Sequence, residues 1–341
     1  MEKPQSKPTA YQRPTSGIFP FLPESWVPYA ELMRLDRLGG FITFFLPCIF
    51  GLAYATAIAT VQPSLLLLVD RSITIFLCCV LARGSSCAWN DSVDRDFDQK
   101  VERCSVRPIA RGAVTRSQAN TWAIVQFAMM VILAARAPVA VFKYLVAILP
   151  LGMMYPFAKR YTNYPQAVLG TTFGVGSLMS ARSVHVFPMD PEFLAPSMCV
   201  VFVNTLWSMI YDTIYAHQDV ADDIHVGVKG MAVKYQNCTK LACSVMSVPM
   251  LGLLTAIGVL TELGPLYYVF AIGGGGISLA VTISFVNLKD EKNCAWWFSH
   301  GYTMFGMSIL AGFLADSLSK TVPASDFMDM SHNSSWIHTE L

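Results

Sequence analysis

The sequence is poor in charged residues. Asp, Glu, Lys and Arg make up only 14% of its 341 residues, whereas about 25% is usual in soluble globular domains. Hydrophobic residues account for 54%, which leaves too little polar surface to coat a globule of this size. The shortage of charge therefore argues against a soluble enzyme and against a disordered chain, and it predicts a polytopic membrane protein.

Two further absences narrow the class of protein. The 24 Lys and Arg residues almost balance the 23 Asp and Glu residues, so the net charge is only +1 and no global field would attract nucleic acid. The nine cysteines include no C-x-x-C pair, and most lie in apolar stretches, where cysteine packs as a small hydrophobe. Neither a disulfide framework nor a zinc site is indicated, and nothing indicates an obligate protein partner.

What the sequence has in abundance is long apolar stretches. A helix needs about 20 mostly apolar residues to cross a lipid bilayer. The stretches that meet or approach this length are 38–60, 70–89, 118–135, 138–158, 165–187, 193–216, 240–260, 265–287 and 295–315. They predict an all-α membrane protein with about nine transmembrane helices. The polar residues 1–27 are expected to form a disordered arm, and residues 319–341 a polar tail.

The placement of Lys and Arg predicts a topology. When the N-terminus and the loops after every second stretch are put on one side, that side carries most of the basic residues. Basic loops stay on the cytosolic side of a membrane. The N-terminus and these loops are therefore expected to face the cytosol or its equivalent, with the C-terminus opposite.

Two acidic clusters lie on this basic side. The first follows the stretch 70–89 and contains Asp91, Asp94 and Asp98, which on a helix line one face. The second closes the stretch 193–216 and contains Asp212, followed by Asp219, Asp222 and Asp223. If the helix continues, Asp212, Asp219 and Asp223 again share a face.

Stacked carboxylates beside a membrane are costly unless a cation lies between them. Singly placed hard oxygen ligands suit Mg²⁺ held jointly by carboxylates and substrate phosphates. One alternative is a solvated acidic loop. Another is a cation transporter, whose carboxylates would lie near the middle of the bilayer, whereas these lie at the ends of the apolar stretches.

The motifs resemble those of a known family. Asn90-Asp91-x-x-Asp94-x-x-x-Asp98 is similar to the first aspartate motif of UbiA-type intramembrane aromatic prenyltransferases. Tyr211-Asp212-x-x-Tyr215, continuing through Asp219 and Asp223 to Lys229, is similar to their second. The stretches 32–37, 101–112, 155–160 and 165–170 agree as well, so the resemblance covers residues 28–318.

The resemblance implies a helical bundle around a central cavity, in which the two motifs face each other and Mg²⁺ grips the diphosphate of a prenyl donor. The implied metal ligands are Asn90, Asp91, Asp94, Asp98, Asp219 and Asp223, and the five aspartates among them are the implied catalytic residues. The implied contacts of the diphosphate and prenyl chain are Asn90, Arg37, Arg107, Tyr155, Lys159, Asp212 and Lys229.

The resemblance leaves the substrates and the compartment open. One subclass joins farnesyl diphosphate to orsellinic-acid-type phenolic acids in meroterpenoid biosynthesis, in the endoplasmic reticulum or Golgi membrane. Another prenylates 4-hydroxybenzoate for ubiquinone in the mitochondrial inner membrane, and a third cyclises its prenyl diphosphate without an acceptor. The Pro-rich arm 1–27 lacks a transit-peptide pattern, which favours the first subclass. Leu38-Gly39-Gly40 and Gly230 depart from the family pattern near the cavity mouth.

Neighbouring features are expected to play no part in the chemistry. His217 is interpreted as a packed helical histidine, and Asp96 and Asp222 point away from the shared faces. The run Gly273 to Gly276 predicts close helix packing or a local kink.

Overall fold

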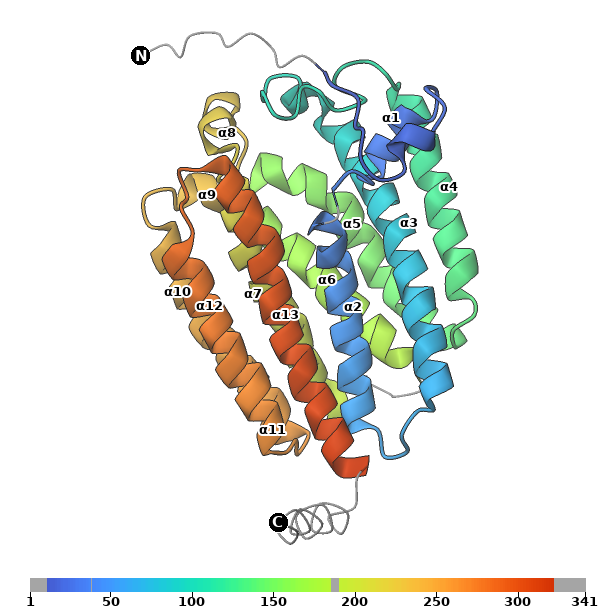
Figure 1. Cartoon of the computed structure of the whole chain (residues 1–341), viewed down its shortest axis with the longest axis vertical. Coiled ribbons are helices and arrows are strands. Elements are labelled where there is room, and N and C mark those ends of the chain that lie inside the picture. Colours follow the sequence, from blue (N-terminus) through green and yellow to red (C-terminus); the bar gives the residue numbers. More distant parts are fainter. Residues whose placement is uncertain (1–10, 38, 185–189, 322–341) are drawn as a thin grey trace, which may run out of the picture.

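The computed structural model describes residues 11–37, 39–184 and 190–321, and within them it is all-helical (Figure 1). The long helices are α2 (Gly39–Ile58), α3 (Leu65–Asp98), α4 (Arg116–Ala134), α5 (Phe142–Tyr161), α6 (Pro165–Arg182), α7 (Pro191–Ala216), α10 (Thr239–Leu260), α12 (Gly275–Phe285) and α13 (Glu291–Thr321). Shorter elements are η1 (Phe19–Phe21), α1 (Val27–Leu32), η2 (Val139–Val141), α8 (Val220–Val226), α9 (Met231–Lys234), α11 (Pro265–Tyr267) and η3 (Tyr268–Gly274).

Each predicted apolar stretch forms a helix over most of its described residues. Within the described part of the chain, seven helical segments are long and apolar enough to cross a membrane, so the expected count of nine is not reached on this criterion. The two stretches that fall short form α6 and α13. Helix α6 packs against α2, α5 and α7, and because protein rather than lipid covers it, it tolerates Gly, Ser and Thr.

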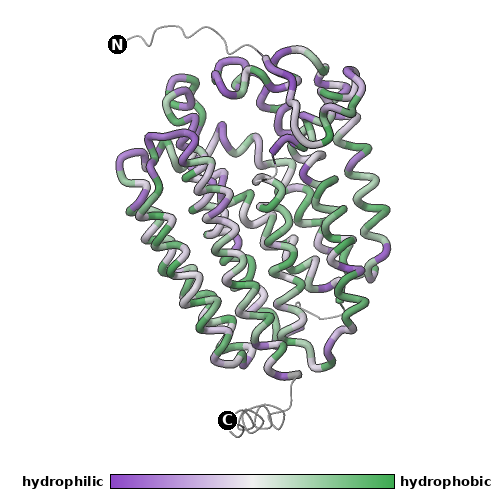
Figure 2. The backbone as a smooth tube through the Cα atoms, viewed as in Figure 1, coloured by the Kyte–Doolittle hydropathy of each residue, from purple (hydrophilic) through white to green (hydrophobic). Residues whose placement is uncertain are grey.

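Polarity is divided along the bundle. In Figure 2 the helices are mostly hydrophobic, and hydrophilic residues gather at the end that carries α1, α8 and α9. The last turn of α13 lies at the opposite end (Figure 1). The arrangement agrees with the predicted topology, in which the basic loops share one side.

Glycines allow α6 to approach its neighbours closely. A Cβ atom on Gly170 would lie 2.6 Å from Thr205 Cα, and one on Gly174 would lie 2.7 Å from Val201 Cα. A Cβ atom on Gly51 would lie 1.9 Å from the carbonyl oxygen of Ser177. No side chain fits in these gaps, so the three glycines fix how α2 and α7 pack on α6.

The glycine run of the eighth apolar stretch does produce an irregular helix. Residues Tyr268–Gly274 form a π-helical turn between α11 and α12. Turns of this kind bend or bulge a helix. The expectation of a local kink is confirmed.

The two polar ends of the chain differ from the predicted arm 1–27 and the predicted tail 319–341. Residues 11–27 are not a free arm: Phe19 is fully buried, and Arg13 Nη2 donates to its carbonyl oxygen at 3.0 Å and to that of Leu22 at 2.9 Å. An apolar anchor and a bridging guanidinium hold this segment in place. Residues 1–10 lie outside the described part of the chain. Helix α13 runs to Thr321, past the predicted start of the tail at 319, and residues 322–341 are also outside it.

Candidate active site

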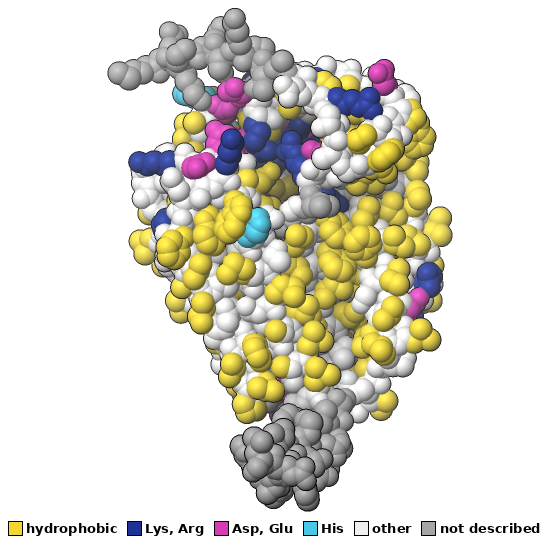
Figure 3. Space-filling model, in the orientation of Figure 1, with side chains coloured by type: hydrophobic (Ala, Val, Ile, Leu, Met, Phe, Trp, Pro, Cys, Tyr) yellow, Lys and Arg dark blue, Asp and Glu magenta, His cyan; other side chains and the backbone are white. Residues whose placement is uncertain are grey.

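A cavity of about 330 Å³ opens at the charged end of the bundle. Figure 3 shows the hollow, with Lys, Arg, Asp and Glu side chains gathered around it. Its walls come from α2, α3, α5, α6, α7 and α13 and from the segments 101–107 and 228–233. Both acidic clusters line it, so carboxylates more than a hundred residues apart in the chain meet in one place.

The first cluster lies on the last turns of α3. This helix is continuous to Asp98, so Asp91, Asp94 and Asp98 share one face as predicted, and all three are buried. Their positions at the end of the membrane-spanning part do not fit a transporter site in the middle of the bilayer.

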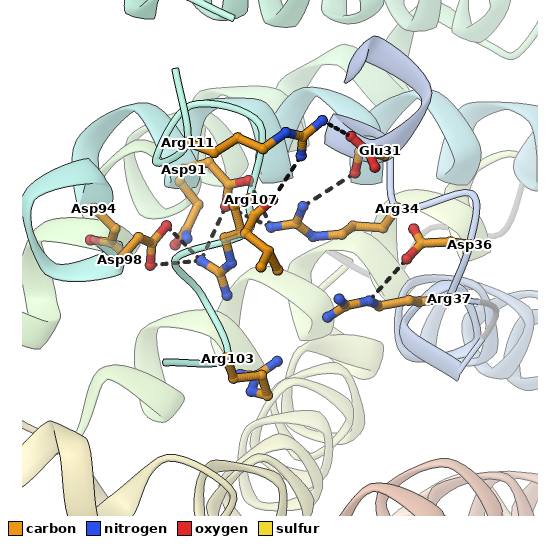
Figure 4. A network of polar contacts seen from close by, with 12 residues as sticks. Glu31, Arg34, Asp36, Arg37, Asp91, Asp94, Asp98, Arg103, Arg107 and Arg111 are labelled. Carbon is orange, nitrogen blue, oxygen red and sulfur yellow. Dashed lines mark hydrogen bonds and ion pairs between the residues drawn. The ribbon is translucent and has the colours of Figure 1, made fainter. Parts of the chain in front are cut away.

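Each carboxylate of the first cluster is paired with a cation, and Figure 4 draws the pairs that Arg34 and Arg107 form. Arg34 Nη2 lies 2.7 Å from both oxygens of Asp91. Arg107 Nη1 lies 2.9 Å from both oxygens of Asp98. Buried carboxylates persist only when they are paired in this way. Lys159 Nζ donates to Asp94 at 2.8 Å.

The second cluster differs from the prediction of one continuous helix. Helix α7 ends at Ala216, and Asp219 is the N-cap of α8, with φ −115° and ψ 2°. The Asp219 side chain makes no capping hydrogen bond there and pairs with Arg103 instead. Asp212, Asp219 and Asp223 nevertheless all line the cavity.

The second cluster is less fully paired. Arg103 forms an ion pair with Asp219, donating from Nε at 2.8 Å. Asp212 and Asp223 form no ion pair with any residue of the described chain. Burial, together with the neighbouring charge of Asp219, raises the pKa of Asp223 to about 7.

Most of the remaining predicted site residues are brought together. Asn90, Tyr155 and Lys229 line the cavity beside the clusters. Lys159 Nζ lies 5.3 Å from the centroid of the Tyr155 ring and 3.4 Å from Asn90 Oδ1. Lys229 donates to the carbonyl oxygen of Tyr161 at 3.4 Å.

Arg37 is the one predicted site residue that does not enter the cavity. Its side chain is 45% exposed, pairs with Asp36 at 3.1 Å, and does not line the cavity. Arg34 lies there instead, with φ +57°, a left-handed conformation that costs energy in a residue other than glycine. The buried Arg83 holds this turn, donating to the carbonyl oxygens of Arg34 at 2.9 Å and Arg37 at 2.8 Å.

Sequence reasoning therefore missed Arg34 as a cavity residue. Arg83 was a usable signal, because a lone charge inside an apolar stretch requires polar partners. Its partners are the backbone of the turn that carries Arg34.

The residues that were expected to play no part in the chemistry lie outside the cavity wall. His217 is buried, its Nε2 lies 2.8 Å from Thr239 Oγ1, and burial lowers its pKa. It does not line the cavity. Asp96 pairs with Arg116 at 3.0 Å on the surface. Asp222 accepts a hydrogen bond from the backbone N–H of Glu102 at 3.2 Å.

A second cavity, of about 520 Å³, continues the first between α2, α3, α4, α5 and α6. The two share Phe44, Gly152 and Phe173 as wall residues. Its lining is mostly apolar, and Arg71 lies at its far end, where Nε donates to the carbonyl oxygen of Ser183 at 3.2 Å. The joined cavities offer a polar compartment for an anion and an apolar compartment for a chain.

Mg²⁺ is the metal that the resemblance implies. Among the described residues, no three His, Cys, Asp or Glu side chains converge on a point that could hold a metal ion. Mg²⁺ keeps several waters and takes one or two carboxylates together with substrate phosphates, so it needs no such cage. Asp94 Oδ1 is buried without a hydrogen-bond partner in the described chain and faces this cavity. The carboxylates thus fit a Mg²⁺ site that phosphate oxygens complete.

These features define an all-helical, multi-pass integral membrane enzyme with paired acidic motifs at one end of its bundle. The model of the UbiA prenyltransferase family matches residues 44–309, and the chain belongs to this family. It is a prenyltransferase.

Curated relatives extend over nearly the whole chain. Prenyltransferase ascA of Acremonium egyptiacum is 35% identical over 316 residues, which cover 92% of each chain. Prenyltransferase stbC of Stachybotrys bisbyi is 32% identical and covers 91% of this chain and 93% of its own. UbiA prenyltransferase claS of Ampulloclitocybe clavipes is 33% identical, with coverage of 85% and 90%.

Solved structures share the fold. A UbiA homologue from Archaeoglobus fulgidus, bound to GPP and Mg²⁺, superposes with a TM-score of 0.62 at 16% identity and covers 84% of this chain and 99% of its own. The apo UbiA homologue from Aeropyrum pernix K1 gives 0.61 at 19% identity, with coverage of 82% and 98%.

Proposed function

We propose that the protein transfers a farnesyl group from farnesyl diphosphate to a ring carbon of an orsellinic-acid-type phenolic acid in meroterpenoid biosynthesis, with Mg²⁺ as cofactor. The observation that carries the proposal is the junction of the two cavities. A compartment lined by both acidic clusters opens into a mostly apolar one of about 520 Å³. This arrangement suits a diphosphate with a long apolar chain. The similarity to fungal prenyltransferases supports prenyl transfer.

The carboxylates of the two clusters, with Asn90, would hold Mg²⁺. When bound, Mg²⁺ would neutralise the charge that builds up on the leaving diphosphate. The A. fulgidus homologue with bound GPP and Mg²⁺ supports this choice of metal.

Basic residues of the cavity would contact the diphosphate directly. We assign this role to Arg34, Arg107, Lys159 and Lys229, with Arg34 in place of Arg37, because these cations line the cavity. Arginine and lysine suit phosphate oxygens. In the structure Arg34, Arg107 and Lys159 are paired with carboxylates, so they are already held in position before a ligand arrives.

The reaction breaks the allylic C–O bond of the donor, forms a bond from the allylic carbon to the ring, and releases diphosphate and the ring proton. Cations arranged in advance stabilise the negative charge of the departing diphosphate. The apolar cavity keeps water from the allylic cation, which would otherwise be hydrolysed. The Tyr155 ring, beside Lys159, would face the positive charge that develops.

The test is a substrate panel. The full chain, in microsomes or lipid nanodiscs, receives dimethylallyl, geranyl, farnesyl and longer prenyl diphosphates, each with orsellinic acid, 4-hydroxybenzoate or no acceptor, with and without Mg²⁺. We expect Mg²⁺-dependent farnesyl-orsellinic acid, detected by mass. A product only with 4-hydroxybenzoate and long donors, or a cyclised product without acceptor, would contradict the proposal.

The proposal includes the endoplasmic reticulum or Golgi membrane as the compartment. Fractionation of expressing cells against marker proteins of each organelle tests it. Cofractionation with mitochondrial inner-membrane markers would contradict it.

A further inference from the structure

Two polar side chains between α6 and α7 point into the cavity without partners. Gln166 and Ser208 are each 3% exposed and line the cavity wall. Gln166 Oε1 and Ser208 Oγ have no hydrogen-bond partner in the described chain. Buried polar atoms are nearly always paired, so these two are placed to receive a ligand.

Asp212 adds a carboxylate to the same wall. It lies one turn after Ser208 on α7, so the two side chains share a face. Unlike Asp91, Asp94, Asp98 and Asp219, it forms no ion pair with a described residue.

The position of this group is set by the helix packing. Gln166 lies one turn before Gly170 on α6, where a Cβ atom would lie 2.9 Å from Ser208 Cβ. The close approach at Gly170 keeps Gln166 opposite Ser208 and Asp212. The three side chains thus belong to a rigid part of the bundle.

The chemistry of the group favours the aromatic acceptor over the prenyl donor. Gln166 Oε1 and the Asp212 carboxylate are hydrogen-bond acceptors, so without a metal ion between them they would repel a diphosphate. A prenyl chain has no polar atom for them. A phenolic acceptor does carry hydroxyl donors, and aromatic side chains that line the same cavity suit its ring: Phe44 and Phe173, whose ring centroids lie 5.0 Å apart, and Tyr302.

We propose that Gln166, Ser208 and Asp212 form the acceptor subsite, which recognises a phenolic hydroxyl group of the aromatic substrate. The inference rests on the proposed function and assigns Asp212 to the acceptor rather than to the donor. A phenol whose O–H donates to a carboxylate is richer in electrons at its ring carbons. The subsite therefore orients the ring toward the allylic carbon and activates it.

Kinetics with the two substrates varied separately test the subsite. Asp212→Asn, Gln166→Ala and Ser208→Ala are compared with wild type on orsellinic acid and farnesyl diphosphate. We expect the KM for orsellinic acid to rise at least tenfold in Asp212→Asn and Gln166→Ala and about threefold in Ser208→Ala. The KM and Mg²⁺-dependent binding of the donor should change less than about twofold.

Thr205→Ala is the matched control. Thr205 lies on α7 one turn before Ser208, but its hydroxyl donates to the carbonyl oxygen of Val201 at 2.9 Å and lies outside the cavity wall. Its KM values should equal those of wild type. A change in the acceptor KM equal to that of Ser208→Ala would overturn the assignment.

An O-methylated acceptor sharpens the test. If Asp212 receives a phenolic O–H, methylation should lower kcat/KM at least tenfold in wild type and less than threefold in Asp212→Asn. Equal discrimination by both proteins would contradict the inference.

Failure of the subsite differs from failure of the proposed function. If wild type binds farnesyl diphosphate with Mg²⁺ but prenylates no phenolic acid, the proposed function and the assignment of the acceptor subsite are both wrong. If wild type is active and the variants alter the donor KM instead, only the subsite is wrong. Donor binding also reports whether each variant is folded, and Ser208→Ala removes only one oxygen atom.

Discussion

The two acidic clusters face the same cavity but are built differently. The first lies on the uninterrupted end of α3, and all three of its aspartates are buried and paired with a cation. The second is split by the end of α7 at Ala216, and of Asp212, Asp219 and Asp223 only Asp219 forms an ion pair with a described residue. The first cluster is therefore a half-site whose charges are already neutralised and held in position, whereas the second leaves carboxylates available to ligands.

The two clusters should also differ in how much each aspartate contributes to the stability of the fold and to the reaction. Breaking a buried ion pair leaves an uncompensated charge and destabilises the fold. An unpaired carboxylate on a helix outside the membrane can be removed without that cost. The same reaction therefore depends on two sets of aspartates whose substitutions should differ in their effect on folding.

The largest effect is expected for the aspartates themselves. Asp94→Ala and Asp223→Ala should each lower turnover about 10²–10³-fold, because each removes a group that stabilises transition-state charge. Only Asp94→Ala should also lower the melting temperature, because it leaves the partly buried Lys159 unpaired. Product formation and thermal unfolding in detergent measure the two effects. The control is Asp96→Ala, at an exposed residue of α3, and equal melting temperatures for both site variants would contradict the comparison.

A smaller loss should distinguish Arg34 from Arg37. Removing a hydrogen bond to a charged group costs about 1.5–3 kcal/mol, so Arg34→Ala should lower turnover about 10- to 100-fold. Arg37→Ala should stay within about twofold, because its side chain lies on the surface. Initial rates at saturating donor measure both losses. A larger loss in Arg37→Ala than in Arg34→Ala would restore Arg37 as the phosphate contact.

A pH effect of about tenfold or less should come from the second cluster. The pKa of Asp223 is raised to about 7, so the carboxyl group is largely protonated at pH 6. A metal ligand must lose its proton, so at limiting Mg²⁺ the apparent affinity for Mg²⁺ should fall by up to about tenfold between pH 7 and pH 6. Mg²⁺ titrations from pH 5.5 to 8.5 measure it. Asp223→Asn should flatten the profile, and an unchanged profile in that variant would assign the titration elsewhere.

The smallest effect on turnover is expected for the substitution of His217, which lies next to the second cluster in the sequence. His217 packs against Thr239 and does not line the cavity. His217→Ala should change turnover less than about threefold while lowering the free energy of unfolding by about 0.5–3 kcal/mol. A loss of activity as large as that of Asp223→Ala, with stability intact, would make this histidine part of the site.

Local sequence was sufficient for much of the fold and site. Long apolar stretches predicted the helices because a membrane permits few other backbone structures. The i, i+3, i+7 spacing placed Asp91, Asp94 and Asp98 on one face because α3 is regular there. The motif order also led to the right family.

Other parts depended on contacts between segments distant in the chain. Residues 11–27 look polar in sequence, yet Phe19 anchors them. Arg34 and Arg37 lie three positions apart and look equivalent, but only Arg34 turns toward Asp91, because Arg83 of α3 holds the intervening backbone.

By itself the sequence determined the helices and the residue types of both acidic clusters, since these follow from apolar length and helical period, and its charge placement predicts an orientation in the membrane. Only the tertiary structure decided where α7 stops, which arginine enters the cavity, and that Gln166 stands opposite Ser208. The physical reason is that partners supplied by other helices set these features. The packing at Gly170 and the backbone contacts of Arg83 arise only once the bundle is assembled.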